Sequence, residues 1–242
     1  MERKQFLQGL GLVGLGTFAI PLLKSCSTSD DGTSSQTGSC TVSPTETVGP
    51  FPTSKGDPSF FASAGYMRQD IRDGESGVPL NVEIIIKNTN NNCEIVSGAI
   101  VEIWHCNRNG YYSEFGPSNS GGMQSVDMTA YDFLRGKQAT DDSGTATFQS
   151  VYPGWYNGRA PHIHVHIYSA SGVSKLVTQI AFTESISTQV YTNSSFYNGS
   201  AQGTSNASDN VFSNSLAQNM CDTLTGDISN GYTLTKTIYV AF

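Results

Sequence analysis

The sequence predicts an all-β fold, an antiparallel β-sandwich with long loops and little helix. From Leu80 onward, apolar residues recur mostly with a period of two, as in strands with one buried face. These runs are rich in β-branched and aromatic residues and are bounded by Gly, Asn, Asp and Ser. They do not alternate with helical patterns, which argues against a parallel α/β sheet. With 242 residues, 37% of them hydrophobic, the chain is long enough for one sizeable core.

The periodic runs predict at least six strands and one short helix. The expected strands lie near Leu80–Lys87, Ala99–His105, Thr145–Val151, His162–Tyr168, Val177–Phe182 and Tyr232–Ala241. The only helix expected after the N-terminal segment spans Val211–Leu224. The stretch Thr192–Asn210, rich in Asn, Ser and Gly, is expected to be a long surface loop.

The N-terminus has the pattern of an export signal. Arg3 and Lys4 precede an apolar, Gly-rich stretch from about Phe6 to Leu23, which is marginal for a membrane span. This start resembles a twin-arginine signal, and the small residue before Cys26 resembles the end of a bacterial lipoprotein signal. We expect residues 1–25 to be a signal segment and Cys26 to carry a lipid anchor in the periplasm or at the cell surface. A cleaved secreted protein and an uncleaved anchor remain alternatives.

The residues after Cys26 predict a tether followed by a domain. Residues 26–39 are polar and without periodicity, which is typical of a flexible linker, and residues 40–242 are expected to form the folded domain. An even number of remaining cysteines in an exported protein suggests two disulfides, although three pairings are possible. We favour Cys40 with Cys93 and Cys106 with Cys221, and buried free thiols are the alternative.

The charge balance argues against a nucleic-acid partner. The chain has 13 basic and 20 acidic residues, giving a formal charge of -7. No Lys/Arg cluster appears outside the N-terminus, so no basic surface for phosphates is expected.

One short run has the pattern of a metal site. His162 and His164 are two apart, so in a strand their side chains point to the same face. Tyr156 lies six residues before His162. A phenolate is a hard anionic donor whose unperturbed pKa is about 10, so it binds well only to a strongly polarising cation. These three side chains therefore indicate ferric iron.

Further motifs extend this pattern into a family resemblance. They lie at Pro44–Phe51, Val101–Ser113, Phe133–Gly136 and Tyr152–His164. In this order they resemble the intradiol ring-cleavage dioxygenases, above all the exported branch of that family. The resemblance extends from Pro44 through Gln179. It implies that a non-haem ferric ion is held by Tyr112, Tyr156, His162 and His164.

The resemblance also implies a reaction. A catechol-type aromatic would be cleaved by O2 between its two hydroxylated carbons, giving a cis,cis-muconate. Arg159 would stabilise negative charge on the bound ring, Gln179 would line the same pocket, and Tyr156 would leave the metal and accept a proton. A non-catalytic catechol- or siderophore-binding iron protein of the same fold is the alternative.

Several side chains compete with the predicted ligands. Tyr111 and Tyr152 are tyrosines close to the two predicted tyrosine ligands. His166 continues the face of the histidine pair, and three histidines would suit zinc or ferrous iron. The resemblance makes His166 a wall or core residue. We expect His105 to be structural or to lie just behind the ligands.

Overall fold

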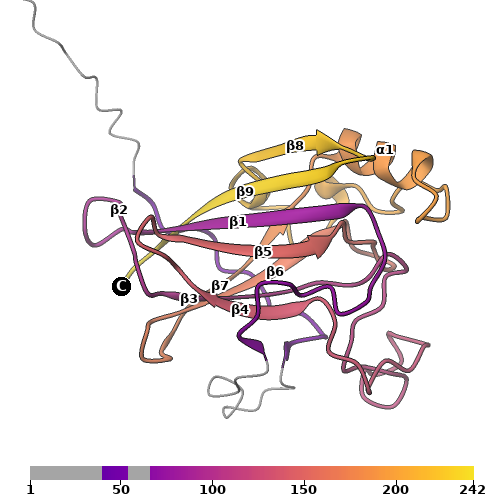
Figure 1. The fold of residues 1–242 in the computed structure, drawn as a ribbon, viewed down its shortest axis with the longest axis horizontal. Helices are drawn as coiled ribbons and strands as arrows, with labels where there is room; N and C mark the ends of the chain where they lie inside the picture. Colours follow the sequence, from indigo (N-terminus) through magenta and orange to yellow (C-terminus); the bar gives the residue numbers. More distant parts are fainter. Residues whose placement is uncertain (1–39, 54–65) are drawn as a thin grey trace, which may run out of the picture. The chain divides into compact units, whose positions relative to one another are not determined.

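The computed structural model describes residues 40–53 and 66–242, and there the predicted β-sandwich is confirmed. Nine strands in this part of the chain form two sheets (Figure 1). The predicted signal segment, residues 1–25, and the tether, residues 26–39, lie outside the described residues. In the described ranges, no helix has both the length and the apolar character needed to cross a bilayer.

The first sheet is built around its longest strands. Its members are β1 (Pro79–Asn88), β2 (Glu94–Ile95), β5 (Thr145–Val151), β8 (Thr223–Asp227) and β9 (Gly231–Val240). Strands β2 and β5 pair antiparallel with one edge of β1, β9 pairs with the other edge, and β8 continues from β9 (Figure 1). The β1–β9 pair is parallel, which departs from the fully antiparallel expectation. Parallel pairing is possible because no tight hairpin joins these two strands.

The second sheet carries the metal-site pattern. It contains, in spatial order, β4 (Arg135–Ala139), β3 (Ile100–Trp104), β6 (His162–Tyr168) and β7 (Ser174–Ala181), all antiparallel. Alternation along β6 sends Ile163, Val165 and Ile167 into the main core. The histidines of β6 therefore face the opposite, outer side of this sheet. The core between the sheets also includes Val82, Ile84, Ile86, Val101, Ile103, Phe148, Ile180, Leu234 and Ile238.

All six predicted strands are present, and three further strands were not predicted. Strand β4 has the sequence Arg-Gly-Lys-Gln-Ala, and its long side chains Arg135 and Lys137 are buried. A strand whose buried residues are Arg, Gly and Lys gives no hydrophobic alternation to detect. Strand β8 is almost fully exposed, and β2 has only two residues.

The helix prediction was largely wrong. Within the predicted range Val211–Leu224 only α2 (Leu216–Asn219) is helical. The chain then becomes extended, because Met220 forms a bridge with Ala181 of β7 and β8 begins soon afterwards. The predicted surface loop does lack strands, but it includes the 3-10 helix η4 (Asn206–Ser208).

A ten-residue helix, α1 (Glu184–Asn193), was not predicted. Its buried residues Ser187, Val190 and Tyr191 do have helical spacing. The segment is also rich in Thr, Ser, Val and Ile, which have only moderate or low helix propensity. Packing of this narrow buried face against the core therefore decides its conformation.

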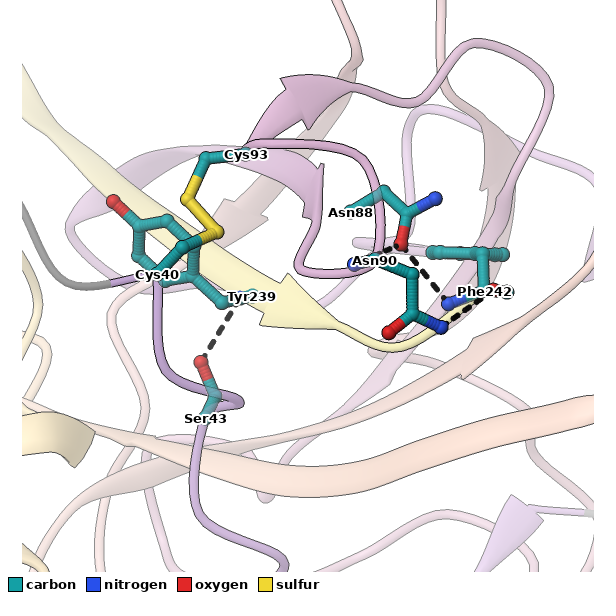
Figure 2. The surroundings of a disulfide bond; sticks show 7 residues. All are labelled: Cys40, Ser43, Asn88, Asn90, Cys93, Tyr239 and Phe242. Atoms are coloured by element: carbon teal, nitrogen blue, oxygen red, sulfur yellow. Dashed lines mark hydrogen bonds between the residues drawn. A yellow bond between two sulfur atoms is a disulfide. The ribbon is translucent and has the colours of Figure 1, made fainter. Parts of the chain in front are cut away.

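A disulfide secures the start of the domain. Cys40 and Cys93 are bonded, with 5.8 Å between their Cα atoms, as the favoured pairing predicted (Figure 2). Three residues further on, Ser43 N–H donates to the Tyr239 carbonyl and Tyr239 N–H donates to Ser43 Oγ, both at 2.9 Å. Residues 43–53, called here the N-terminal segment, are thus fixed to β9 at their beginning.

The second favoured pairing, Cys106 with Cys221, was wrong. Among the described cysteines, these two are free thiols. Cys106 lies in a small aromatic cluster with Trp104 and Tyr112, whereas Cys221 packs against the main core between the sheets. The Cys221 N–H donates to the Ala181 carbonyl, which holds it at the end of β7. The two thiols therefore belong to different packing clusters.

The N-terminal segment covers the outer face of the second sheet. In register across the four strands lie Arg135, Trp104, His164 and Gln179. Arg135 Nη1 donates to the Phe51 carbonyl at 3.1 Å, and Gln179 Nε2 donates to the Thr47 carbonyl at 2.8 Å. These bonds anchor the segment at both edges of the row and enclose the face that carries the histidines.

Candidate metal centre

Strand β6 places two imidazoles side by side. His162 and His164 are both buried on its outer face, and their Nε2 atoms lie 3.1 Å apart. The ring of His164 stacks on Trp104 with 4.7 Å between centroids and an interplanar angle of 4°. The strand and the tryptophan together fix the direction in which the two nitrogens point.

The loop after β3 brings a phenol to the same point. Tyr112 is fully buried, and its hydroxyl lies 3.2 Å from His162 Nε2. The backbone of Tyr112 is clamped by one amide side chain. Its N–H donates to Gln124 Oε1 at 2.7 Å, and its carbonyl accepts from Gln124 Nε2 at 2.9 Å. This loop is therefore held in place independently of any ligand.

The loop after β5 supplies the second phenol. Tyr156 is partly buried, and its ring meets those of Tyr112 and His162 edge to face at 5.8 and 5.7 Å. The two tyrosine loops touch at Gly110, which has a φ of +84°. A Cβ there would collide with the Trp155 carbonyl oxygen, so only glycine permits this close approach.

The hydrogen bonds of both rival tyrosines lie away from this place. The Tyr152 hydroxyl shares a hydrogen bond of 2.9 Å with Ser187 Oγ inside the main core. The Tyr111 N–H donates to Asn107 Oδ1 at 3.1 Å, and its side chain is only partly buried. The geometry therefore favours the two tyrosines that the resemblance selected.

The two remaining histidines are satisfied elsewhere. The nitrogens of His166 lie within hydrogen-bond distance of Ser174 Oγ and the Tyr168 hydroxyl, at 2.7 and 2.8 Å. In His105, Nδ1 donates to the Cys106 carbonyl at 2.8 Å and Nε2 lies 2.7 Å from Ser150 Oγ. Both nitrogens of each ring thus have partners away from the metal-site pattern.

Burial sets the protonation of the four predicted ligands. It lowers the pKa of His162 and His164 well below the usual histidine value, with a further contribution from neighbouring positive charge. Neutral imidazole is the form that binds metals. Burial also raises the pKa of Tyr112 and Tyr156, so neither phenol ionises without a compensating cation.

The hydrogen bonds of the histidine pair fit a bound cation. His162 Nδ1 donates to the Ala160 carbonyl at 2.6 Å, which leaves the Nε2 lone pair facing His164. Within the described ranges His164 Nδ1 has no hydrogen-bond partner, although it is buried. With its proton on that Nδ1, His164 turns its Nε2 lone pair toward the Nε2 lone pair of His162. A cation shared by both Nε2 atoms would use both lone pairs.

The donor set also restricts the kind of cation. In residues 40–53 and 66–242, no three His, Cys, Asp or Glu side chains cluster as metal ligands. A metal at this place would therefore need the phenols as well as the imidazoles. Two phenolates offset two positive charges, which fits a trivalent ion better than zinc. The predicted ligand set stays a prediction, but the residues present are suited to ferric iron.

The two predicted pocket residues lie beside these donors and bind each other. Arg159 Nη2 donates to Gln179 Oε1 at 2.6 Å. Arg159 Nη1 lies 3.5 Å from the Tyr156 hydroxyl and 3.4 Å from His162 Nε2. The Arg159 side chain is only 8% exposed. It therefore presents a fixed positive charge at the meeting point of the four donors.

Sequence reasoning missed three residues that shape this site. Phe51 stacks on Tyr112, Gly49 lies against the His164 ring, and Asp209 forms an ion pair with Arg159 at 2.8 Å. Phe51 and Gly49 belong to the Pro44–Phe51 motif, which indicated the family but no contact. Asp209 stands in a polar loop and carries no detectable signal in the sequence.

The chain is similar in sequence to known dioxygenases. A sequence model of the family described as Dioxygenase matches residues 56–192. Catechol 1,2-dioxygenase 1 of Acinetobacter lwoffii is 31% identical over 134 residues, which is 48% of this chain and 39% of that protein. A chlorocatechol 1,2-dioxygenase of Rhodococcus opacus is 26% identical over 36% of this chain and 37% of its own length. The chain thus spans about two fifths of the length of these curated relatives.

A solved structure matches over a much larger share. An intradiol ring-cleavage dioxygenase from Tetranychus urticae superimposes with a TM-score of 0.69 at 28% identity, covering 84% of this chain and 95% of that one. The dioxygenase domain of a carbohydrate-binding fusion protein from a Streptomyces species has a TM-score of 0.55 at 22% identity, which supports the fold alone.

Proposed function

The chain belongs to the intradiol ring-cleavage dioxygenase family, and we propose that it cleaves a catechol-type ring with O2 between the two hydroxylated carbons. The product would be a cis,cis-muconate. The cofactor would be a non-haem ferric ion held by Tyr112, Tyr156, His162 and His164.

One observation carries this proposal. Two phenols and two neutral imidazoles, from three separate elements, converge beside a buried guanidinium, with the Tyr112 hydroxyl and His164 Nε2 each within 3.2 Å of His162 Nε2. The names of the relatives, catechol and chlorocatechol 1,2-dioxygenase, support a catechol-type substrate. The match to the Tetranychus urticae enzyme over most of both chains supports intradiol cleavage.

The side chains can be assigned different tasks in this reaction. When bound, ferric iron would draw electron density from a coordinated catechol and lower the pKa of the oxygen acids attached to it. Tyr156 is the less buried phenol, so it is better placed than Tyr112 to move aside and accept a substrate proton. Arg159 would stabilise negative charge on the ring oxygens, because its Nη1 lacks a short hydrogen bond. Gln179 would hold the Nη2 side of the Arg159 guanidinium by accepting its hydrogen bond.

Oxygen uptake by the iron-loaded protein tests the proposal. We would offer catechol, protocatechuate, hydroxyquinol and larger plant-derived catechols, and identify the products by mass. The expected result is one O2 consumed per ring-opened product. The ferric protein should also show a visible phenolate-to-iron charge-transfer band that changes in Tyr112→Phe but not in the neighbouring Tyr111→Phe. A catechol-dependent spectral shift without oxygen uptake would instead favour the non-catalytic binder.

We also propose that the protein is exported and anchored by lipid at Cys26. The signal-like residues 1–25 support this, and so does the Cys40–Cys93 disulfide, because disulfides persist in oxidising compartments. Growth with labelled palmitate would test it. Label should enter the full chain and be absent from Cys26→Ala, and equal labelling of both would contradict the anchor.

A further inference from the structure

A fully buried carboxylate lies behind the candidate site, in a segment beyond the residues matched by the family comparison. Asp209 is 0% exposed and follows η4, whereas the matched residues end at 192. We propose that Asp209 is a positioning residue that orients Arg159 and His162 for binding the catechol dianion. This inference rests on the proposed function, because it concerns the same site.

The Arg159 guanidinium has one edge occupied by Asp209. Its Nε lies 3.0 and 2.8 Å from the two carboxylate oxygens, in an ion pair with almost no solvent. The Nη atoms point the other way, toward Gln179, Tyr156 and His162. A guanidinium held by one edge keeps its other donors at fixed positions. Asp209 thus determines which edge of Arg159 faces the ligand site.

The same carboxylate reaches the histidine through one peptide unit. Asp209 Oδ2 accepts the Ala160 N–H at 2.8 Å. The Ala160 carbonyl in turn accepts from His162 Nδ1 at 2.6 Å, which keeps Nε2 free of a proton. Partners behind a metal-binding histidine fix its tautomer and ring direction. Asp209 therefore positions both the Arg159 guanidinium and the predicted metal ligand His162.

The segment that carries Asp209 is itself well anchored. Val211 N–H donates to Asp209 Oδ1 at 2.9 Å, and the Asp209 N–H donates to the Ser205 carbonyl at 3.0 Å. Asn206 Nδ2 donates to the Phe182 carbonyl at 2.8 Å, which ties the segment to the end of β7. The Phe212 ring lies 5.5 Å from the Arg159 guanidinium carbon and closes the space beside it. This well-anchored segment therefore holds the Asp209 carboxylate in place.

Asp209→Asn tests this role, with Asp222→Asn as the matched control. Asp222 also pairs with a cation, Lys236 at 3.1 Å, but on a partly exposed surface. We expect Asp209→Asn to keep the fold and the ferric charge-transfer band, while its affinity for 4-nitrocatechol and its kcat fall roughly 10- to 100-fold. Asp222→Asn should stay within about twofold of the parent in both. Affinity and kcat within twofold of the parent in Asp209→Asn would overturn the proposal.

A second readout separates this proposal from the proposed function. Proton–nitrogen correlation spectra of the full chain without added metal should show, beside the Nε–H of the equally buried Arg135, a strongly protected arginine Nε–H that disappears in Arg159→Lys and shifts in Asp209→Asn. If the parent protein neither colours with iron nor consumes O2, the proposed function fails, and this signal alone decides whether Asp209 positions Arg159. A signal unaffected by Asp209→Asn overturns the positioning role. If Asp209→Asn does not fold, Asp209→Glu is measured instead. A 4-nitrocatechol affinity of Asp209→Glu equal to that of the parent would also overturn the proposal.

Discussion

Phe51 stacks face to face on Tyr112, with 4.5 Å between ring centroids and an interplanar angle of 15°. The same ring meets Phe115 and Tyr156 edge to face at 5.3 and 5.6 Å. Its carbonyl accepts a hydrogen bond from Arg135. One residue of the N-terminal segment therefore touches both predicted phenol ligands, and the segment forms part of the wall of the site.

Replacing Phe51 by Ala is expected to lower the free energy of unfolding by about 3–5 kcal/mol, as for other buried aromatic truncations. The charge-transfer band of the iron-loaded protein should also shift, because Tyr112 loses its stacking partner. Denaturant unfolding and visible spectra measure the two effects. Phe196→Ala is the control, since that side chain is 44% exposed and should change stability by less than about 0.5 kcal/mol. Equal losses in the two variants would contradict this packing role.

The two tyrosines on either side of Pro153-Gly154-Trp155 should behave differently. Tyr156→Phe removes a predicted ligand and is expected to change the colour and lower the iron content of the protein. Tyr152→Phe removes only the hydrogen bond to Ser187, so it should cost about 1–2 kcal/mol of stability and leave the colour intact. Metal analysis after dialysis and thermal unfolding separate the effects. If Tyr152→Phe lost the colour while Tyr156→Phe kept it, Tyr152 rather than Tyr156 would be the ligand.

The disulfide is expected to stabilise the domain through its unfolded state. Cys40 and Cys93 are separated by 53 residues, so the bond constrains a long loop and should contribute roughly 2–4 kcal/mol. Cys93→Ser should lower Tm by about 5–10 °C in calorimetry, given the size of the chain. Cys221→Ser is the control, because Cys221 is a free thiol. A Tm loss of the same size there would show that the disulfide is not responsible.

The sequence predicted the strands whose inner faces are apolar, and it missed β4, whose buried side chains are polar. In β6, Ile163, Val165 and Ile167 alternate visibly with the histidines. In β4, Arg135 and Lys137 are buried on the outer face, so a strand of the same sheet looked like a loop. Hydrophobic alternation reports only the core between the sheets. The polar outer face that holds the candidate site is invisible to it.

The candidate site shows a similar division. Tyr156, Arg159, His162 and His164 lie within nine residues, so one local motif revealed most of the donors. Asp209 lies 50 residues beyond Arg159 and meets it only because the chain returns after α1. Contacts between segments far apart in one sequence leave no pattern in it. The residues that orient the donors were therefore found only in the folded chain.

The N-terminal segment lies close against a predicted ligand at Gly49. This glycine has a φ of +71°, and a Cβ added to it would lie 2.9 Å from His164 Cε1. Gly49→Ala should therefore push the imidazole or the segment away, in addition to straining the backbone by about 1–2 kcal/mol. We expect weaker iron binding and faster loss of iron to a chelator, measured by the decay of the visible band.

Gly74→Ala is the control that separates displacement of the His164 ring from backbone strain. Gly74 has a φ of +83°, close to that of Gly49, but a Cβ there would meet no atom of the described residues within 4 Å. Both variants should lose similar stability from the backbone, while only Gly49→Ala should release iron faster. If the two variants release iron at the same rate, the close approach to His164 does not matter for the metal. If only Gly49→Ala is affected, the N-terminal segment determines where the His164 ring can lie, and the site requires a residue without a side chain at this position.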